Sequence, residues 1–286
     1  MPFFRDDKDL PTTGHDWDGI REYDRPTPSW WLWVFWACVL WAIVYWVLMP
    51  AWPLVGDYTR GLLGYSQRQV VANDVAKANA AQAGYVKRIA EAPLDAVRTD
   101  PELLEFALAA GRSAFAVNCS QCHGQGAQGA PGFPNLNDDD WLWGGSLEEI
   151  HRTIRFGVRS GHAETHESQM PAFFKDQLLD ARQVNDVAEF VLSLSKRAGD
   201  AAAAARGGEL FTPNCASCHG DAGQGNKEFG APSLADAIWL YGGDKASIVR
   251  TIAYARRGVM PAWEGRLDPV TIKELAVYVH SLGGGK

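Results

Sequence analysis

The motif Cys-x-x-Cys-His occurs twice in this chain, as Cys119-Ser120-Gln121-Cys122-His123 and as Cys215-Ala216-Ser217-Cys218-His219. It is the attachment signature of a c-type haem, because the two thiols add to the haem vinyl groups while the adjoining histidine reaches the iron. A single Cys-x-x-Cys pair also occurs in zinc half-sites and in thioredoxin-like redox centres. Two complete motifs in one chain favour the haem interpretation, and we expect two covalently bound haem c groups.

Each haem motif is followed by a methionine in a nearly identical context, Met170-Pro-Ala-Phe and Met260-Pro-Ala-Trp. A histidine on one face of the iron and a methionine thioether on the other raise its reduction potential. Both faces are then occupied, so such a centre transfers electrons and binds no substrate. The rival ligands are lone histidines, a residue type more often found at surfaces and helix caps: His151, His162, His166 and His280.

The predicted site follows from these motifs, and no catalytic residue is predicted. The expected cofactor-binding residues are Cys119, Cys122, His123, Cys215, Cys218, His219, Met170 and Met260. Four of them are expected to be axial ligands of the haem irons: His123, Met170, His219 and Met260.

The similarity between the two halves extends beyond the motifs. WLWGG at 141–145 matches WLYGG at 239–243, and the sequence RTI follows in both copies. We therefore predict two tandem cytochrome c-type domains, at 101–197 and 200–286. Each would consist of helices joined by long loops, with the haem completing a small core. Four aromatic residues are the expected packing partners of that group: Phe115, Phe211, Trp141 and Trp239.

Helix starts and contacts around the haem can also be predicted. An aspartate directly before a helix, as at 100, 200 and 268, is typical of an N-cap. An iron-bound histidine usually donates a hydrogen bond from its second ring nitrogen to a carbonyl oxygen. Pro134 and Pro232 follow their histidines in matching loops and either accept that bond or only shape turns. Arg152 and Arg250 either bind haem propionates through their forked guanidinium groups or are solvated surface residues.

An uncharged stretch precedes the repeats, at residues 29–56. It is longer than the apolar part of a signal peptide, and the segment ahead of it is acidic on balance. We predict a retained transmembrane helix at 29–52, between a cytoplasmic segment at 1–28 and a periplasmic helical linker at 53–100. Bacterial c-type haem is attached outside the cytoplasm, so the residues after the span are expected in the periplasm. With one span, the chain would be a single-pass protein of the inner membrane. Four of the five cysteines belong to the haem motifs and the fifth, Cys38, lies within the span, so no structural disulfide is expected. The fold class is all-α: one N-terminal transmembrane helix followed by the two haem domains.

The net charge of −7 argues against a nucleic-acid partner and is compatible with docking a basic cytochrome. No phosphate-binding loop, catalytic triad or carboxylate pair stands out. A free-standing peroxidase or dehydrogenase would need an iron with an open position, and the two methionines argue against one.

Five stretches together resemble a known family over nearly the whole chain: residues 13–20 (TGHDWDGI), 28–31 (PSWW), 168–173 (SQMPAF) and the two haem motifs. They resemble the dihaem subunit III, called CcoP or FixP, of the cbb3-type cytochrome c oxidase. By residues alone, His15 within the first stretch is a solvent-exposed loop histidine.

This resemblance implies a respiratory role. Such subunits lie in the membrane beside a catalytic haem–copper subunit and a monohaem cytochrome subunit. They pass electrons from a soluble or membrane cytochrome c toward oxygen reduction, which is coupled to proton translocation, and are themselves not catalytic. The alternatives are a membrane-tethered dihaem shuttle and the cytochrome subunit of another periplasmic redox enzyme. The resemblance also implies exchanged ligands, with Met170 on the His219 haem and Met260 on the His123 haem, whereas spacing alone favours ligation within each domain.

Overall fold

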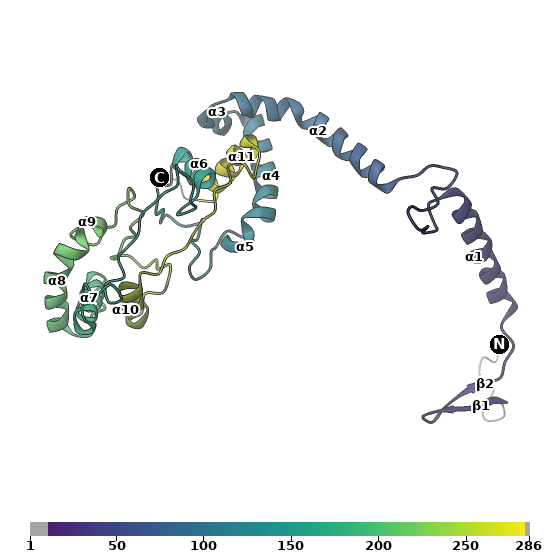
Figure 1. The fold of residues 1–286 in the computed structure, drawn as a ribbon, viewed down its shortest axis with the longest axis horizontal. Coiled ribbons are helices and arrows are strands. Elements are labelled where there is room, and N and C mark those ends of the chain that lie inside the picture. The colour runs from purple at the N-terminus through teal and green to yellow at the C-terminus, as the bar shows by residue number, and fades with distance from the viewer. Residues whose placement is uncertain (1–10, 284–286) are drawn as a thin grey trace. The chain divides into compact units, whose positions relative to one another are not determined.

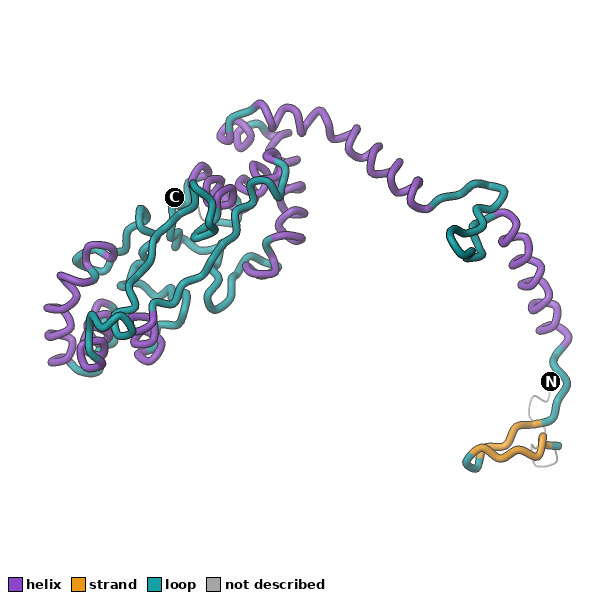
Figure 2. Tube along the Cα trace, in the orientation of Figure 1, coloured by secondary structure: helices purple, strands orange, loops and turns teal. Residues whose placement is uncertain are grey.

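The computed structural model describes residues 11–283 as a helix-rich chain with two compact units, Met1–Ala81 and Gln82–Lys286 (Figures 1 and 2). Residues 1–10 of the predicted segment 1–28, and residues 284–286 of the predicted domain 200–286, lie outside the described residues.

A short β-hairpin opens the described chain, which the all-α expectation does not include. Strand β1 (Thr12–Trp17) pairs antiparallel with β2 (Ile20–Tyr23). Asp18 and Gly19 both have positive φ, the conformation that a tight two-residue hairpin turn requires. Asp16 reinforces the turn by accepting a hydrogen bond from the Gly19 N–H at 2.7 Å. His15 is exposed as expected, but it lies in a strand because this turn pairs the flanking residues.

Helix α1 (Ser29–Leu48) is the predicted membrane helix. Its 20 residues carry no charge and none of its side chains is buried within the protein. At 1.5 Å per residue the helix is about 30 Å long, which matches the hydrocarbon core of a bilayer. It ends at Leu48 rather than at residue 52, because Pro50 follows and the residue before a proline disfavours helical backbone.

The predicted helical linker contains α2 (Gln67–Glu91) and α3 (Leu94–Thr99). The cytochrome region then follows the sequence repeat, with a long helix, a single turn after the first cysteine, and two further helices in each copy. The first copy contains α4 (Pro101–Asn118), α5 (Ser120–His123), α6 (Leu147–Phe156) and α7 (Ala181–Leu194). The second contains α8 (Ala201–Asn214), α9 (Ala216–His219), α10 (Lys245–Tyr254) and α11 (Pro269–His280). Figure 2 shows that long loops join them.

Aspartate caps confirm the predicted helix starts. Asp100 accepts hydrogen bonds from the N–H groups of Glu102 and Leu103, at 3.0 and 3.2 Å. Asp268 accepts one from the Val270 N–H at 2.8 Å, and Pro269 begins the helix behind it. These side chains satisfy N–H groups that the first turn leaves without a partner.

The two hydrophobic cores do not coincide with the repeats at 101–197 and 200–286. Helix α4 of the first copy packs against α11 of the second, and α8 of the second copy packs against α7 of the first. We call the core that contains α4, α6 and α11 the His123 module, and the core that contains α7, α8 and α10 the His219 module. The six residues at 195–200 join α7 to α8, and a link of that length favours antiparallel neighbours.

Glycines allow the helices in each module to cross closely. A Cβ at Gly111 of α4 would overlap the carbonyl oxygen of Glu274 in α11, and one at Gly207 of α8 would overlap that of Asp186 in α7. Aromatic rings pack beside each crossing, with Phe115 and Tyr278 centroids 5.5 Å apart in the His123 module. The two modules therefore use the same crossing geometry, each with one helix from either sequence copy.

Candidate haem-binding sites

The cysteines of each motif lie on one helical turn. Cys119 follows α4 and is the N-cap of α5, and the His123 N–H donates to the Cys119 carbonyl at 3.0 Å. Residues three apart on such a turn present their side chains on the same side. All five cysteines of the chain are free thiols, and burial raises the pKa of both Cys119 and Cys215 to about 11. Both motifs therefore present an unoxidised thiol pair with a histidine at its end.

The motif histidines are held in one orientation. The Nδ1 atom of His123 lies 3.0 Å from the Pro134 carbonyl oxygen, and that of His219 lies 3.0 Å from the Pro232 carbonyl oxygen. A carbonyl only accepts, so each Nδ1 carries the proton and each Nε2 keeps its lone pair for a metal. Burial lowers the pKa of both rings, which favours this neutral form. Of the two roles left open for Pro134 and Pro232, the structure shows the first, with each carbonyl accepting a hydrogen bond from its histidine.

Each methionine packs against one core, and the two are exchanged between the repeats. Met260 packs against the core of the His123 module, to which Cys119 also contributes. Met170 packs against the core of the His219 module, to which Cys215 contributes. Each module thus combines the Cys-x-x-Cys-His motif of one copy with the methionine of the other.

Two tryptophans contribute polar atoms that lack a protein partner. Trp141 and Trp239 are partly buried against the two cores. The indole Nε1 atoms of both are buried with no hydrogen-bond partner in the described structure. A buried N–H without an acceptor is costly, so its occurrence at the same position of both copies indicates a missing acceptor. The carboxylates of a haem are such acceptors, and these residues therefore fit the group that the motifs predict.

Two of the rival histidines, His162 and His166, are engaged elsewhere, and the two candidate arginines are exposed. His166 lies 3.0 Å from the Thr153 hydroxyl and stacks on Trp143, and His162 contacts Glu264. Both histidines therefore have protein partners. Arg152 and Arg250 are exposed, and the guanidinium of Arg152 lies 4.0 Å from the carboxylate of Glu164. Among residues 11–283, no three His, Cys, Asp or Glu side chains gather as a zinc site would need.

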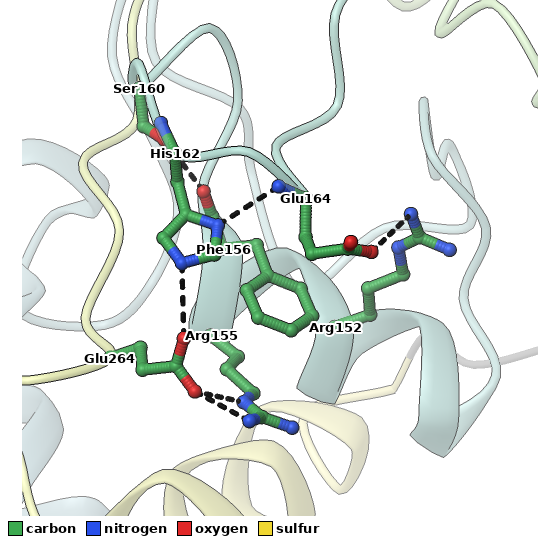
Figure 3. A network of polar contacts seen from close by, with 7 residues as sticks. All are labelled: Arg152, Arg155, Phe156, Ser160, His162, Glu164 and Glu264. Atoms are coloured by element: carbon green, nitrogen blue, oxygen red, sulfur yellow. Dashed lines mark hydrogen bonds and ion pairs between the residues drawn. The ribbon is translucent and has the colours of Figure 1, made fainter.

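A polar network fixes the loop that follows Met260, and sequence reasoning did not find it (Figure 3). Glu264 accepts a hydrogen bond from Arg155 Nε at 2.8 Å and lies 3.0 Å from His162 Nε2. Arg155 holds the pKa of the Glu264 carboxyl below its usual range. Arg155 and His162 belong to the first sequence copy and Glu264 to the second. Only the spatial exchange of the copies brings them together, so no local sequence signal could have revealed the network.

The donor atoms in each module are those that a covalently bound haem requires. Each module offers two thiols for thioether bonds, a neutral imidazole with a free Nε2, and a methionine sulfur against the same core. This donor set suits a low-spin haem c, whose chemistry is electron transfer.

Comparisons with known proteins show which families the sequence matches. Residues 10–56 match the family described as the N-terminal domain of cytochrome oxidase-cbb3, FixP. Residues 106–191 and 202–279 match the family described as cytochrome c oxidase, cbb3-type, subunit III.

Whole-chain relatives give the same assignment. The cbb3-type cytochrome c oxidase subunit FixP of Bradyrhizobium diazoefficiens is 54% identical over 96% of this chain and 95% of its own length. The subunit CcoP of Cereibacter sphaeroides is 50% identical over 96% of both chains, and that of Azospirillum brasilense is 52% identical over 97% of this chain and 96% of its own. Matches of this extent, over the N-terminal segment as well as both repeats, show that the chain belongs to the subunit III family of cbb3-type cytochrome c oxidases.

Proposed function

We propose that this chain is the membrane-anchored electron-transfer subunit of a cbb3-type oxidase and carries two covalently bound haem c groups. Electrons enter from a cytochrome c donor and leave toward a catalytic haem–copper subunit, with a monohaem cytochrome subunit in the same complex. The protein is single-pass in the bacterial inner membrane, with a cytoplasmic N-terminus and periplasmic haem domains. It supplies electrons for oxygen reduction and proton translocation without being catalytic itself.

One observation carries this proposal: each module combines a thiol pair, a histidine fixed by a proline carbonyl, and a methionine. We assign His123 and Met260 to one iron and His219 and Met170 to the other, because each methionine packs against the core that the corresponding motif joins. When bound, a haem with both faces occupied exchanges electrons with partners while admitting no substrate. The protein holds the group, excludes water with its core and keeps the histidine deprotonated at Nε2.

The test is performed on the full-length chain purified in detergent after expression with haem maturation. We expect two covalent haems per chain from a pyridine haemochrome assay, and one after Cys119→Ala with Cys122→Ala. The reduced protein should bind carbon monoxide poorly. One haem per wild-type chain, or stoichiometric carbon monoxide binding, would refute the proposal.

The membrane-tethered shuttle differs in its partners. Gentle detergent extraction of a tagged chain should recover a haem–copper subunit in constant ratio. Recovery of the chain without that subunit would favour the shuttle.

A further inference from the structure

The two methionine loops approach each other at one arginine. Arg159 lies in the loop after α6, directly after Val158, and its guanidinium donates two hydrogen bonds to main-chain carbonyls. Nε donates to the Gly258 oxygen at 2.8 Å and Nη1 to the Ser168 oxygen at 3.0 Å. Gly258 lies two residues before Met260, and Ser168 lies two residues before Met170. One side chain thus binds the same position of both methionine loops.

The surroundings of Arg159 hold both its backbone and its side chain in place. Arg159 is partly buried, and its backbone has a φ of +52°, which non-glycine residues rarely adopt. The Arg159 N–H donates to the His166 carbonyl at 2.9 Å, which fixes the residue at its backbone as well. A guanidinium presents several donors in a rigid planar fork, so one side chain can hold two carbonyls at a set separation.

Two further contacts lie near these loops. Arg257 directly precedes Gly258 and donates to the side-chain oxygen of Gln169, the residue before Met170, so this contact also joins the two loops. Glu264 contacts Arg155 and His162 after Met260. Glu264 provides the matched comparison, because it acts on the chain after Met260.

We propose that Arg159 is a shared positioning residue that holds Met170 and Met260 together, so that the axial ligation of the two haems is mechanically coupled. The proposal rests on the proposed function, since it assumes that both methionines bind iron. Loss of the fork releases two carbonyls at once, and both sulfur atoms lose part of their positional restraint. Neither methionine has to be in contact with Arg159 for this to occur.

The experiment uses the full-length chain carrying both haems and measures two properties. They are the sulfur-to-iron charge-transfer absorption of the oxidised protein and the two reduction potentials from a redox titration. Met170→Leu and Met260→Leu assign each signal to one methionine. We expect Arg159→Gln to weaken both charge-transfer signals and to lower both potentials. Glu264→Gln should affect only the Met260 signal.

A second variant separates geometry from charge and retains the bulk of the side chain. Arg159→Lys keeps the positive charge but replaces the fork by one ammonium, so we expect at least one signal to remain weakened. Full recovery of both signals by Arg159→Lys, or a change at only one haem in Arg159→Gln, would overturn the coupling. If the two methionine variants remove no signal, the proposed function itself fails and the coupling falls with it. If they do, and Arg159→Gln changes neither haem, only the coupling fails.

Discussion

The main chains of Val158 and Met260 are hydrogen bonded in both directions, each N–H donating to the other's carbonyl at 3.0 Å. The pair forms an antiparallel bridge between the first sequence copy and the second. It fixes the backbone of the second copy's methionine beside the end of α6 in the His123 module.

Exchanged ligation can be tested in a chain that keeps one haem. With Cys119→Ala and Cys122→Ala, only the His219 haem remains attached. We expect Met170→Leu in this background to lower the reduction potential and open the iron to carbon monoxide, because leucine has no sulfur donor. Met260→Leu in the same background should change neither property. The opposite result would show ligation within each repeat.

Substitution of the crossing glycines should destabilise the modules. Gly111→Ala and Gly207→Ala each place a methyl group against a carbonyl of the partner helix, and overpacking of this kind costs about 1–3 kcal/mol or more. Gly84→Ala in α2 is the control, since nothing lies within 4 Å of its Cβ position. There we expect a gain of about 0.5–1 kcal/mol from helix propensity. Thermal unfolding followed by circular dichroism measures both effects. An unchanged melting temperature in Gly111→Ala would contradict the close crossing.

Glu274 should make the stability pH-dependent. Burial, with a contribution from Asp268, raises the pKa of its carboxyl to about 7, against an ordinary value of 4.5. The folded state therefore favours the protonated form, and stability falls as the pH rises from about 4.5 through 7. Glu274→Gln should remove this loss, with a gain on the order of 2 kcal/mol at pH 8. Denaturant unfolding at pH 5 and pH 8 measures the difference.

Asp186 occupies the equivalent position of the His219 module and serves as the control. It forms a two-pronged ion pair with Arg206, at 2.6 and 2.9 Å, and this arginine lowers the pKa of the Asp186 carboxyl. Stability from that pair is present above the ordinary carboxyl pKa and is lost only at more acidic pH. Asp186→Asn should therefore destabilise the protein equally at pH 5 and pH 8. An equally flat profile for Glu274→Gln and the wild type would contradict the burial argument.

The buried indole groups give a test that does not depend on activity. Trp141→Phe and Trp239→Phe keep an aromatic ring and remove the N–H. If that group donates to the bound haem, each variant should destabilise the haem-loaded protein by about 1 kcal/mol. A neutral or stabilising effect, measured by thermal unfolding of the loaded protein, would show that the N–H has no acceptor there.

Local chemistry made much of the structure predictable. Asp100, Asp200 and Asp268 begin helices where the sequence placed them, and His123 and His219 donate to the expected proline carbonyls. The hairpin was missed although Asp18-Gly19 is a strong turn signal, because its strands are short and fully exposed.

The sequence could not show which of α7 and α11 packs against α4 and which against α8. Gly111 and Gly207 offer the same crossing surface, and α7 and α11 begin with similar caps and apolar faces, so either pairing suits the local residues. The Arg159 contacts and the Glu264 network depend on that pairing and could not be anticipated either.

The exchange of α11 has a consequence for biosynthesis. Every helix of the core around His219 has been translated before α11 is made, whereas the core around His123 lacks α11 until residues 269–280 have been translated. The site encoded first is therefore completed last, and a chain released after residue 258 would have the core around His219 whole and the core around His123 without α11.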